Sequence, residues 1–414
     1  MTARAATVPF AIVLATAILL RIVLMLAIPL GPRVENRLEG LNDEPAHFNY
    51  VRHLAEHHEL PIQVGNVRDP GAFERADFEY YQPPLYYLLC ALPVHWSGEN
   101  VGLWICRGFS VACGLLSLPL LAGVLGLLGL GQAERRAGVT FAALLPVHAY
   151  FSSVVSNDSL CWLMALAITH ELLMRVQGWG PARPQPRFTL EPDLRVGVLL
   201  GLGMLTKSAI IAFYPVTVLT YALVLQRERG RGALAGVAVA IGSSLLIAGS
   251  WYMRNLLLYG SPLAIDIGFG PPQPGRLELA TQFLSMTGTV QSFWFPMRHV
   301  PNSVLENAVW AVGLAVVTIH AVAAVAYLAS RRPLGAPVVV AVTVLAVVLA
   351  GHVALNLRWG EAEGRFLLPA LGPIVYLIVA PTFALARRWR VSESLAWAYI
   401  VALAVHPYVL LGVA

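Results

Sequence analysis

Long apolar segments alternate with short polar ones along almost the whole chain. About 20 apolar residues suffice to cross a bilayer as a helix, because the hydrocarbon core is about 30 Å thick and a helix rises about 1.5 Å per residue. Ten segments meet or approach this length: 8–30, 101–130, 137–155, 159–176, 208–226, 233–257, 306–329, 334–356, 366–386 and 391–413. An eleventh, 196–206, is short and spans the membrane only if tilted neighbours or a locally thinned bilayer accommodate it. The pattern predicts an all-α polytopic membrane protein with about 11 transmembrane helices.

We expect these segments to belong to a single membrane domain that covers residues 1–414. Its parts are a first transmembrane helix at 8–30, a first extracytoplasmic loop with juxtamembrane helices at 31–100, a central bundle at 101–257, a second large extracytoplasmic loop at 258–305 and C-terminal transmembrane helices at 306–413. Segment 85–96 is too short to cross the bilayer, so we predict a juxtamembrane or re-entrant helix there. No small-residue cleavage motif follows the first segment before Arg33, and we expect that segment to be retained.

Arginine clusters separate the apolar segments, at 135–136, 175–195, 227–231, 331–332 and 387–390. Cytoplasmic loops of membrane proteins are enriched in Lys and Arg. If all five clusters are cytoplasmic, an even number of spans separates each cluster from the next, and the amino terminus is also inside. The turns between paired helices then lie on the outer face. These outer turns collect most of the unusual polar residues, so we expect a functional site that faces outward.

The composition supports a membrane protein. Hydrophobic residues make up 57% of the chain and charged residues 12%, against about 45–50% and about 25% in soluble globular proteins. Two or three soluble domains are therefore excluded. The net charge of +5 does not indicate nucleic-acid binding, because the basic residues lie in short clusters between spans. All but one of the 28 basic residues are arginines, and the exception is Lys207. The four cysteines have no CxxC spacing, so we predict neither a disulfide framework nor a cysteine zinc site.

Asp43 and Glu44 begin a predicted helix over 44–58 in the first outer loop, and Pro45 fits its first turn. The sequence leaves two interpretations of Asp43. It can cap the helix by accepting backbone N–H bonds. Alternatively, it can act together with His47, which lies one helical turn further on the same face, so that the two side chains hold a metal, a hydroxyl group or each other. A carboxylate beside a low-dielectric surface is suited to the role of a general base.

Aromatic residues surround a diproline in the stretch 79–89, Glu-Tyr-Tyr-Gln-Pro-Pro-Leu-Tyr-Tyr-Leu-Leu. By composition alone, this stretch is more typical of an aromatic belt at the membrane interface, followed by a helix. The alternative is one wall of a sugar or lipid cleft, because tyrosine offers an apolar face and a hydroxyl group. The candidate cleft residues are His47, Tyr81, Gln82, Pro83, Tyr86 and Asn157.

Charged residues at the other outer turns also have structural alternatives. Asp158 can cap a turn, and Arg254 and Arg365 can snorkel toward the interface. An ionised acid between two apolar segments nevertheless needs a partner or water. Two acids and three cations are predicted to lie at the same depth in the membrane, on its outer face: Asp43, Asp158, Lys207, Arg254 and Arg365. This set suits a lipid-linked phosphate donor, because the cations can hold the phosphate while an acid deprotonates an incoming hydroxyl.

Six short motifs together resemble the C-type (GT-C) glycosyltransferase superfamily, which includes the protein O-mannosyltransferases and the lipid A aminoarabinose transferases. They occur in the family's order across residues 8 to about 386, as Asp43-Glu44, Gln82-Pro83-Pro84-Leu85-Tyr86-Tyr87, Asn157-Asp158, Leu205-Thr206-Lys207, Trp251-Tyr252-Met253-Arg254-Asn255 and Gly364-Arg365-Phe366-Leu367-Leu368-Pro369. The ordered set is more specific than any single motif. The chain departs from many relatives in its modest loop 258–305, and we expect no large soluble domain after the last span.

The resemblance implies a GT-C-like helical bundle that transfers a sugar from a polyprenyl-phosphate donor to a hydroxyl acceptor, with inversion, on the extracytoplasmic face. The acceptor class, a lipid, a glycan or a protein, stays open. The candidate catalytic residues are Asp43 as base, its neighbour Glu44, and Asp158 near the acceptor or an ion. Lys207 and Arg365 are implied phosphate contacts, to which Arg254 is added by position. Some relatives need a divalent metal and others do not, and the sequence does not decide between them.

Two other functions stay open from the sequence. One is a secondary transporter or flippase, favoured by Lys207 in a break between short segments. The other is a polysaccharide polymerase or ligase that shares the lipid-linked substrate. Against the transporter, no internal repeat is detected and the ionisable groups lie on one predicted face. We expect an integral protein of a prokaryotic plasma membrane, with its active site on the extracytoplasmic side and no nucleic-acid partner.

Overall fold

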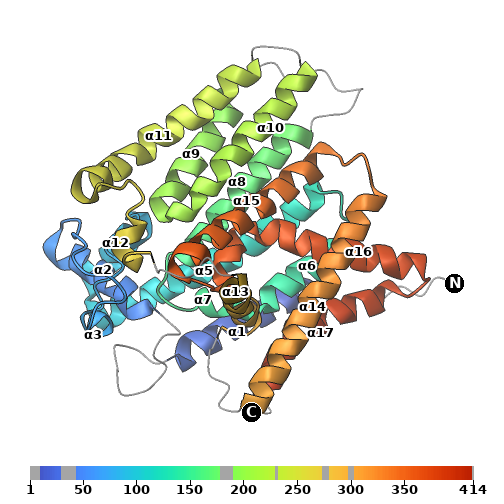
Figure 1. Ribbon diagram of the computed structural model, residues 1–414, viewed down its shortest axis with the longest axis horizontal. Coiled ribbons are helices and arrows are strands. Elements are labelled where there is room, and N and C mark those ends of the chain that lie inside the picture. The colour runs from blue at the N-terminus through green and yellow to red at the C-terminus, as the bar shows by residue number, and fades with distance from the viewer. Residues whose placement is uncertain are drawn as a thin grey trace.

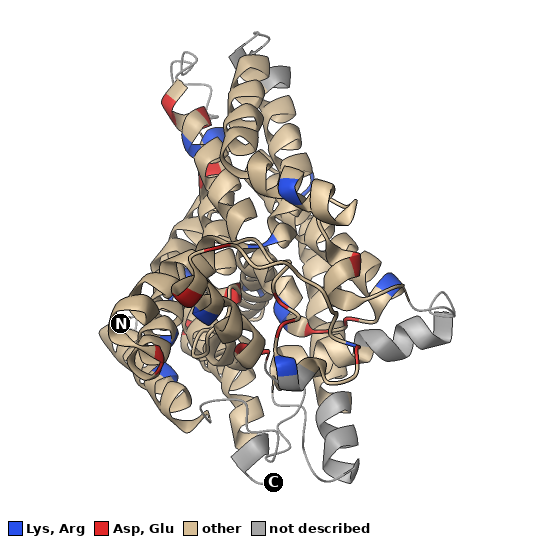
Figure 2. Cartoon of the chain, turned by 90° about the vertical axis from the view of Figure 1, so that its left-hand side faces the viewer, with Lys and Arg blue, Asp and Glu red and all other residues tan. Residues whose placement is uncertain are grey.

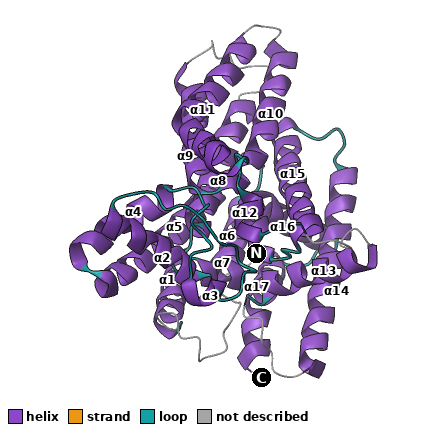
Figure 3. Ribbon diagram, turned by 60° about the vertical axis from the view of Figure 1, so that its left-hand side comes forward, coloured by secondary structure: helices purple, strands orange, loops and turns teal. Residues whose placement is uncertain are grey.

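The computed structural model describes residues 10–28, 43–177, 190–228, 232–272, 279–296 and 303–412. These residues form helices joined by loops, without a strand (Figure 3). The predicted all-α class is therefore confirmed. Parts of the predicted first span, of both extracytoplasmic loops and of the arginine clusters lie outside the described residues, as does the end of the last predicted span.

Each of the eleven predicted spans overlaps a helix. Seven of them correspond to one long helix each: α1 (Phe10–Ala27), α5 (Glu99–Leu127), α8 (Asp158–Gln177), α11 (Gly232–Tyr259), α14 (Ser303–Ser330), α15 (Ala336–Trp359) and α17 (Glu393–Gly412). Among the described residues, six helices are long and apolar enough to cross a membrane, and two shorter apolar helices lie at 11–27 and 208–224. The number of about 11 spans stays a prediction.

The other predicted spans have different boundaries in the structure. Predicted span 137–155 is two helices, α6 (Gln132–Leu144) and α7 (Pro146–Phe151), because Pro146 disfavours helical backbone at Leu145, whose ψ is 119°. Predicted span 196–206 begins earlier, as α9 (Leu190–Thr206), with acids in its first turn. The remaining two begin with a 3₁₀ turn: η1 (Ser208–Ala212) leads into α10 (Phe213–Glu228), and η2 (Gly364–Ala370) leads into α16 (Leu371–Arg388).

Short helices lie beside the bundle. The predicted helix 44–58 is α2 (Glu44–His57), and the predicted short piece 85–96 is α4 (Leu85–Ser97). Three further helices were not expected: α3 (Ala72–Arg75), α12 (Ile265–Phe269) and α13 (Leu279–Trp294). Figure 1 shows α2, α3 and α12 together on one side, away from α14, α16 and α17. Segments far apart in the sequence therefore meet there.

Glycines allow α9 and α11 to pack closely. A Cβ atom at Gly197 would lie 2.5 Å from the carbonyl oxygen of Ala240, and one at Gly201 would lie 2.7 Å from Cβ of Ile247. Small residues at helix interfaces let backbones approach, which is the main source of packing energy inside a bilayer. The contact fixes the direction of α9 and hence the position of Lys207 at its end.

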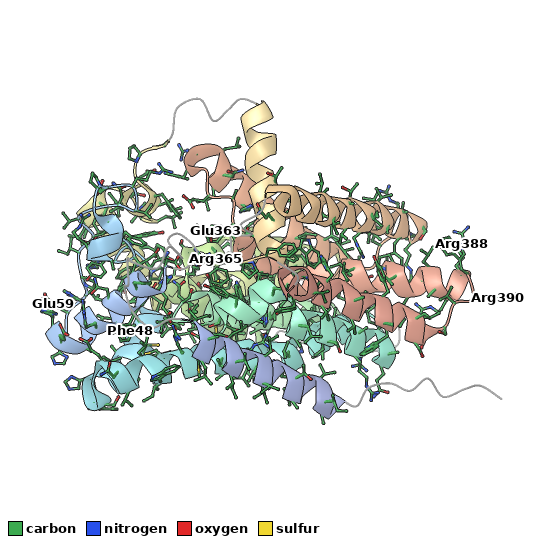
Figure 4. The ribbon with its side chains drawn as sticks, turned by 90° about the horizontal axis from the view of Figure 1, so that it is seen from below. Phe48, Glu59, Glu363, Arg365, Arg388 and Arg390 are labelled. Carbon is green, nitrogen blue, oxygen red and sulfur yellow. The ribbon has the colours of Figure 1, made fainter. Side chains whose placement is uncertain are left out.

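Charged residues are sparse along most of the ribbon (Figure 2). Glu363 and Arg365 lie in the middle of the molecule, whereas Arg388 and Arg390 lie at the far end of the bundle (Figure 4). One arginine cluster is thus separated from Arg365 by the length of α16, as the predicted topology requires. The side of the membrane on which each end lies stays a prediction.

Candidate active site

Four charged residues from four separate segments meet in the structure. The Arg365 guanidinium donates to both carboxylate oxygens of Asp43, at 3.1 and 2.8 Å, and to Oδ2 of Asp158 at 3.2 Å. The Lys207 ammonium donates to Oδ1 of Asp158 at 2.5 Å. Four of the five charged residues that the sequence places at one depth are therefore in one hydrogen-bonded cluster.

Asp43 lies at the N-cap position of α2, but its side chain makes no capping hydrogen bond. Its backbone carbonyl accepts from the N–H groups of Ala46 and His47, both at 3.0 Å. The helix therefore starts without help from the carboxylate, which is free to turn toward Arg365. Of the two interpretations that the sequence left open, the side-chain cap is excluded.

Asp158 and Lys207 are held side by side by the backbone around them. Asp158 is the first residue of α8, and Lys207 follows directly after α9 in extended backbone, with φ −157° and ψ 136°. The Asn157 side-chain amide donates to the carbonyl oxygen of Thr206 at 3.1 Å. This hydrogen bond connects the residue before Asp158 to the residue before Lys207, so it sets the distance between the two charges.

Arg365 is fixed by packing as well as by charge. A Cβ atom at Gly364 would lie 2.4 Å from the backbone nitrogen of Phe293, so only glycine fits there and η2 can approach α13. The guanidinium carbon then lies 4.6 Å from the ring centre of Phe151 and 5.2 Å from that of Phe366. Glu363 places a carboxylate oxygen 2.5 Å from Nε. Two rings and three carboxylates thus surround one cation.

The charged cluster borders a pocket of about 470 Å³. Asp43, Lys207 and Arg365 line it together with Glu79, Glu361 and Glu363. The rest of the lining is mainly apolar, with Phe269, Val348, Leu355 and Phe366 among the larger side chains. A ligand that combines a charged group with an apolar body matches this lining.

The wall formed by α12 packs closely on Tyr81. A Cβ atom at Gly268 would lie 2.1 Å from the Tyr81 ring. The Gly268 carbonyl accepts from the Val67 N–H at 3.0 Å, and the Trp359 indole donates to the Gly270 carbonyl at 2.9 Å. These contacts attach α12 to the first loop and to α15. The attached α12 closes one side of the pocket.

The ionisable groups beside the membrane bundle influence one another. Burial opposes ionisation of Asp43, but the positive charges of Arg365 and His47 outweigh it and hold its pKa well below its usual range. Burial raises the pKa of Glu79, and the negative charge of Asp43 adds to this. Burial lowers the pKa of His47, yet the charges of Asp43 and Glu79 prevail and the net shift is upward. Asp43 is therefore ionised at neutral pH.

Several predicted site residues lie elsewhere. Glu44 is not part of the pocket lining and forms an ion pair with Arg107 of α5, at 2.5 Å. The Arg254 guanidinium donates to the carbonyl of Pro61 at 2.7 Å and stacks over Trp251, also outside the pocket lining. Of the predicted cleft residues, Tyr81 and Gln82 line the pocket, whereas His47, Pro83, Tyr86 and Asn157 are not part of its lining.

The structure also brings in residues that sequence reasoning did not select. Glu79 lies in the aromatic motif and is 8% exposed. Phe366 follows Arg365 and also lies 5.6 Å from the Lys207 ammonium. His352 lines the pocket from the middle of an apolar helix. The sequence offered two signals that could have found them: Glu79 is an acid beside tyrosines, and His352 is a histidine inside an apolar segment. Ionisable residues in such segments are costly to bury, so they often mark a functional site.

The sequence matches no family model and no curated protein. Solved structures do match the fold. ArnT from Cupriavidus metallidurans in the apo state aligns with a TM-score of 0.56 and 16% identity, over 97% of this chain and 70% of ArnT. ArnT from the same organism bound to undecaprenyl phosphate aligns with a TM-score of 0.54, at the same identity and coverage. The oligosaccharyltransferase AglB from Archaeoglobus fulgidus, in complex with an inhibitory peptide and a dolichol-phosphate, gives 0.51 at 13% identity, over 97% of this chain and 55% of AglB.

Both proteins are GT-C glycosyltransferases. The chain therefore has the GT-C fold, as the ordered motifs predicted, and with its apolar helices it is an integral membrane protein. It spans about half the length of AglB. At these identities the likeness establishes the fold, and the activity has to be argued from the site.

Proposed function

We propose that this protein is a glycosyltransferase that moves a sugar from a polyprenyl-phosphate donor to a hydroxyl group of a lipid, glycan or protein. The observation that carries the proposal is the meeting of two acids and two cations at the edge of a largely apolar pocket. Asp43, Asp158, Lys207 and Arg365 come from segments far apart in the chain. The undecaprenyl phosphate and dolichol-phosphate named for ArnT and AglB fit the same combination of phosphate and apolar chain.

In the proposed reaction, Asp43 is the general base. It accepts the proton of the acceptor hydroxyl as that oxygen attacks the anomeric carbon of the donor sugar. The bond between the anomeric carbon and the phosphate oxygen breaks, and its electron pair leaves with the polyprenyl phosphate. Attack from the side opposite the leaving phosphate inverts the anomeric centre. Asp158 serves as the second acid of the site, on the side of Lys207.

The leaving group gains one negative charge during this step, because a phosphodiester becomes a phosphomonoester. Lys207 and Arg365 are the groups that we assign to stabilise that charge. Each is paired with a carboxylate before the donor arrives, Lys207 with Asp158 and Arg365 with Asp43. The donor phosphate competes with these carboxylates for the cations. Arg254, which lies outside the pocket lining, is not part of the proposed phosphate clamp.

A reconstituted assay tests the proposal. The purified protein in lipid is given a panel of polyprenyl-phosphate hexoses and pentoses, and both donor loss and polyprenyl phosphate release are measured. We expect turnover with one donor class and an inverted product. Asp43→Asn abolishes it, whereas Asp266→Asn, an exposed acid outside the pocket lining, does not. Full activity of Asp43→Asn removes Asp43 as the base, and no turnover with any donor and acceptor pair contradicts the proposed reaction.

We further propose that the site lies on the extracytoplasmic side of a prokaryotic plasma membrane. The four native cysteines are buried, so single introduced cysteines can be labelled selectively. A membrane-impermeant thiol reagent added to intact cells reaches Asp266→Cys and does not reach Arg390→Cys, both at exposed positions. The reverse labelling pattern contradicts the proposed orientation.

A further inference from the structure

Three side chains with metal-ligand atoms meet beside the charged cluster. They are Asp43 and His47, one turn apart at the start of α2, and Glu79, in the loop before α4. One ligand atom from each lies within 4.8 Å of the other two. In the described part of the chain, no other three His, Cys, Asp or Glu residues come together in this way.

Two of the three side chains have a buried polar atom without a hydrogen-bond partner. Nε2 of His47 and Oε2 of Glu79 are buried and unpaired. His47 is 1% exposed and Glu79 is 8% exposed, so both lie almost wholly inside the protein. Buried polar atoms are almost always paired, and two unpaired atoms within one such group of three side chains indicate a ligand that interacts with all three.

The hydrogen bonding of His47 prepares it to be a ligand. Its Nδ1 lies 2.7 Å from the Tyr87 hydroxyl. When Nδ1–H donates to that oxygen, Nε2 keeps its lone pair and faces Asp43. Metal-binding histidines are usually oriented in this way, by a hydrogen bond from the ring nitrogen that does not bind the metal.

The distances fit an ion better than a direct hydrogen bond. His47 Nε2 lies 3.5 Å from Asp43 Oδ1, which is long for a charged hydrogen bond. Two ligand atoms that each lie about 2.1 Å from a tetrahedral ion are about 3.4 Å apart. The Glu79 oxygen lies within 4.8 Å of the other two ligand atoms, so it has to approach by about 1.4 Å at most to complete the same arrangement.

Asp158 does not belong to this group, although it is the other acid of the active site. Lys207 donates to its Oδ1 and Arg365 to its Oδ2. Two separate cations therefore hold Asp158, whereas Asp43 accepts from Arg365 and also faces His47. Glu79, by contrast, has an unpaired carboxylate oxygen and belongs to the group of three. The donor set of one imidazole and two carboxylates suits Zn²⁺ or Mn²⁺, whereas Mg²⁺ and Ca²⁺ prefer oxygen ligands alone.

We propose that Asp43, His47 and Glu79 bind one divalent transition-metal ion at the edge of the pocket. The ion joins the start of α2 to the loop that carries Glu79, and it leaves Asp158, Lys207 and Arg365 as a separate group. The argument rests on the ligand atoms and their surroundings and does not require the proposed transfer reaction. Asp43 is shared by the two sites, with Oδ1 facing both His47 and Arg365.

Metal binding can be measured without any donor or acceptor. The full chain in detergent is stripped with a chelator and dialysed against Zn²⁺, Mn²⁺ or Mg²⁺, and bound metal is counted by mass spectrometry. Co²⁺ provides an absorption spectrum that reports its ligands. We expect one Zn²⁺ per chain, weak Mg²⁺ binding, and a rise in melting temperature when Zn²⁺ is added.

The variants separate this site from the charged cluster. Glu79→Gln and His47→Gln each weaken Zn²⁺ binding by at least about 10-fold, the lower range for loss of a supporting or direct ligand group. Asp158→Asn is the matched control, because it removes a buried acid of the same site and keeps Zn²⁺ binding. If Glu79→Gln does not fold, Glu79→Asp tests the same ligand with a shorter side chain.

Three results would overturn the proposal. The first is wild-type protein that binds no Zn²⁺ at millimolar concentration, which assigns the group to a protonated His47 between two carboxylates. The second is unchanged Zn²⁺ affinity in both Glu79→Gln and His47→Gln. The third is loss of binding in Asp158→Asn, which places the ion between Asp43 and Asp158. None of these measurements depends on sugar transfer, so failure of one proposal is distinguishable from failure of the other.

Discussion

Asp43 and Glu44 are neighbouring acids in the sequence that enter two different buried ion clusters. Glu44 accepts from Arg107 at 2.7 and 2.5 Å and from the backbone N–H of Val155 at 2.7 Å. Arg107 also donates to the carbonyl oxygens of Met25, at 2.8 Å, and Ile28, at 3.1 Å. This cluster joins α1, α2, α5 and the turn before α8, and neither charged residue lines the pocket.

Asp43 enters a cluster whose charges are held by other side chains. Arg365 is shared between Asp43 and Asp158, and Lys207 pairs with Asp158. Three of these four residues line the pocket. Side-chain partners can exchange for those of a ligand, whereas the backbone groups around Glu44 and Arg107 cannot leave. From this comparison we propose a structural role for the first cluster and a functional role for the second.

The largest expected effect is on catalysis, in a comparison of Asp43→Asn with Glu44→Gln. Loss of a general base lowers the rate by about 10²–10⁴-fold, so Asp43→Asn reduces kcat by that range. Glu44→Gln keeps most of the activity per folded molecule. The check is single-turnover transfer with the accepted donor, normalised to folded protein. Equal losses in the two variants would contradict the division into a structural and a functional cluster.

The next effect is on the free energy of unfolding. Here we expect Glu44→Gln to lose more than Asp43→Asn, the reverse of their order in catalysis. Glu44→Gln leaves Arg107 with a weaker partner inside the protein, and breaking a buried ion pair costs about 3–5 kcal/mol. Asp43→Asn costs less, because Arg365 keeps Asp158 and Glu363 beside it. Thermal or denaturant unfolding in detergent measures both. A larger loss of stability in Asp43→Asn than in Glu44→Gln would refute the assignment.

Donor binding distinguishes the cations inside the pocket from the one outside it. A hydrogen bond to a charged group contributes about 1.5–3 kcal/mol, equivalent to about 10–100-fold in affinity. Lys207→Met weakens donor binding by that factor, while Arg254→Met, as the matched basic control, leaves it unchanged. Binding is measured by titration with a non-hydrolysable polyprenyl-phosphate sugar. Equal affinities in wild type and Lys207→Met would remove Lys207 from the phosphate clamp.

The smallest predicted effect concerns the pocket wall. A methyl group at Gly268 overlaps the Tyr81 ring, so Gly268→Ala shifts that ring and changes the shape of the pocket. Overpacking of this kind costs about 1–3 kcal/mol, and we expect a few-fold rise in KM for the donor with little change in kcat. Gly242→Ala is the control, since no atom lies within 4 Å of its Cβ position. Identical KM values in the two variants would exclude the α12 wall from donor recognition.

Sequence reasoning predicted the helices well because their signals are local. A run of apolar residues determines a membrane helix whatever its partners, and α2 and α4 were predicted within a residue or two of their observed bounds. Breaks inside predicted spans were missed at Pro146 and at η1 and η2. At those positions, tertiary contacts such as the approach of Gly364 to Phe293 decide the backbone.

The sequence by itself determined an all-helical membrane chain with a few polar residues between its apolar segments, and it identified Asp43, Asp158, Lys207 and Arg365 among them. Only the tertiary structure shows that Asp43 pairs with Arg365, 322 positions away, and that Glu44 pairs with Arg107, 63 positions away. It also placed Arg254 outside the pocket lining and brought Glu79 beside His47. Local hydrophobic patterns fix which segments form helices, but the partner of a buried charge depends on how distant helices pack.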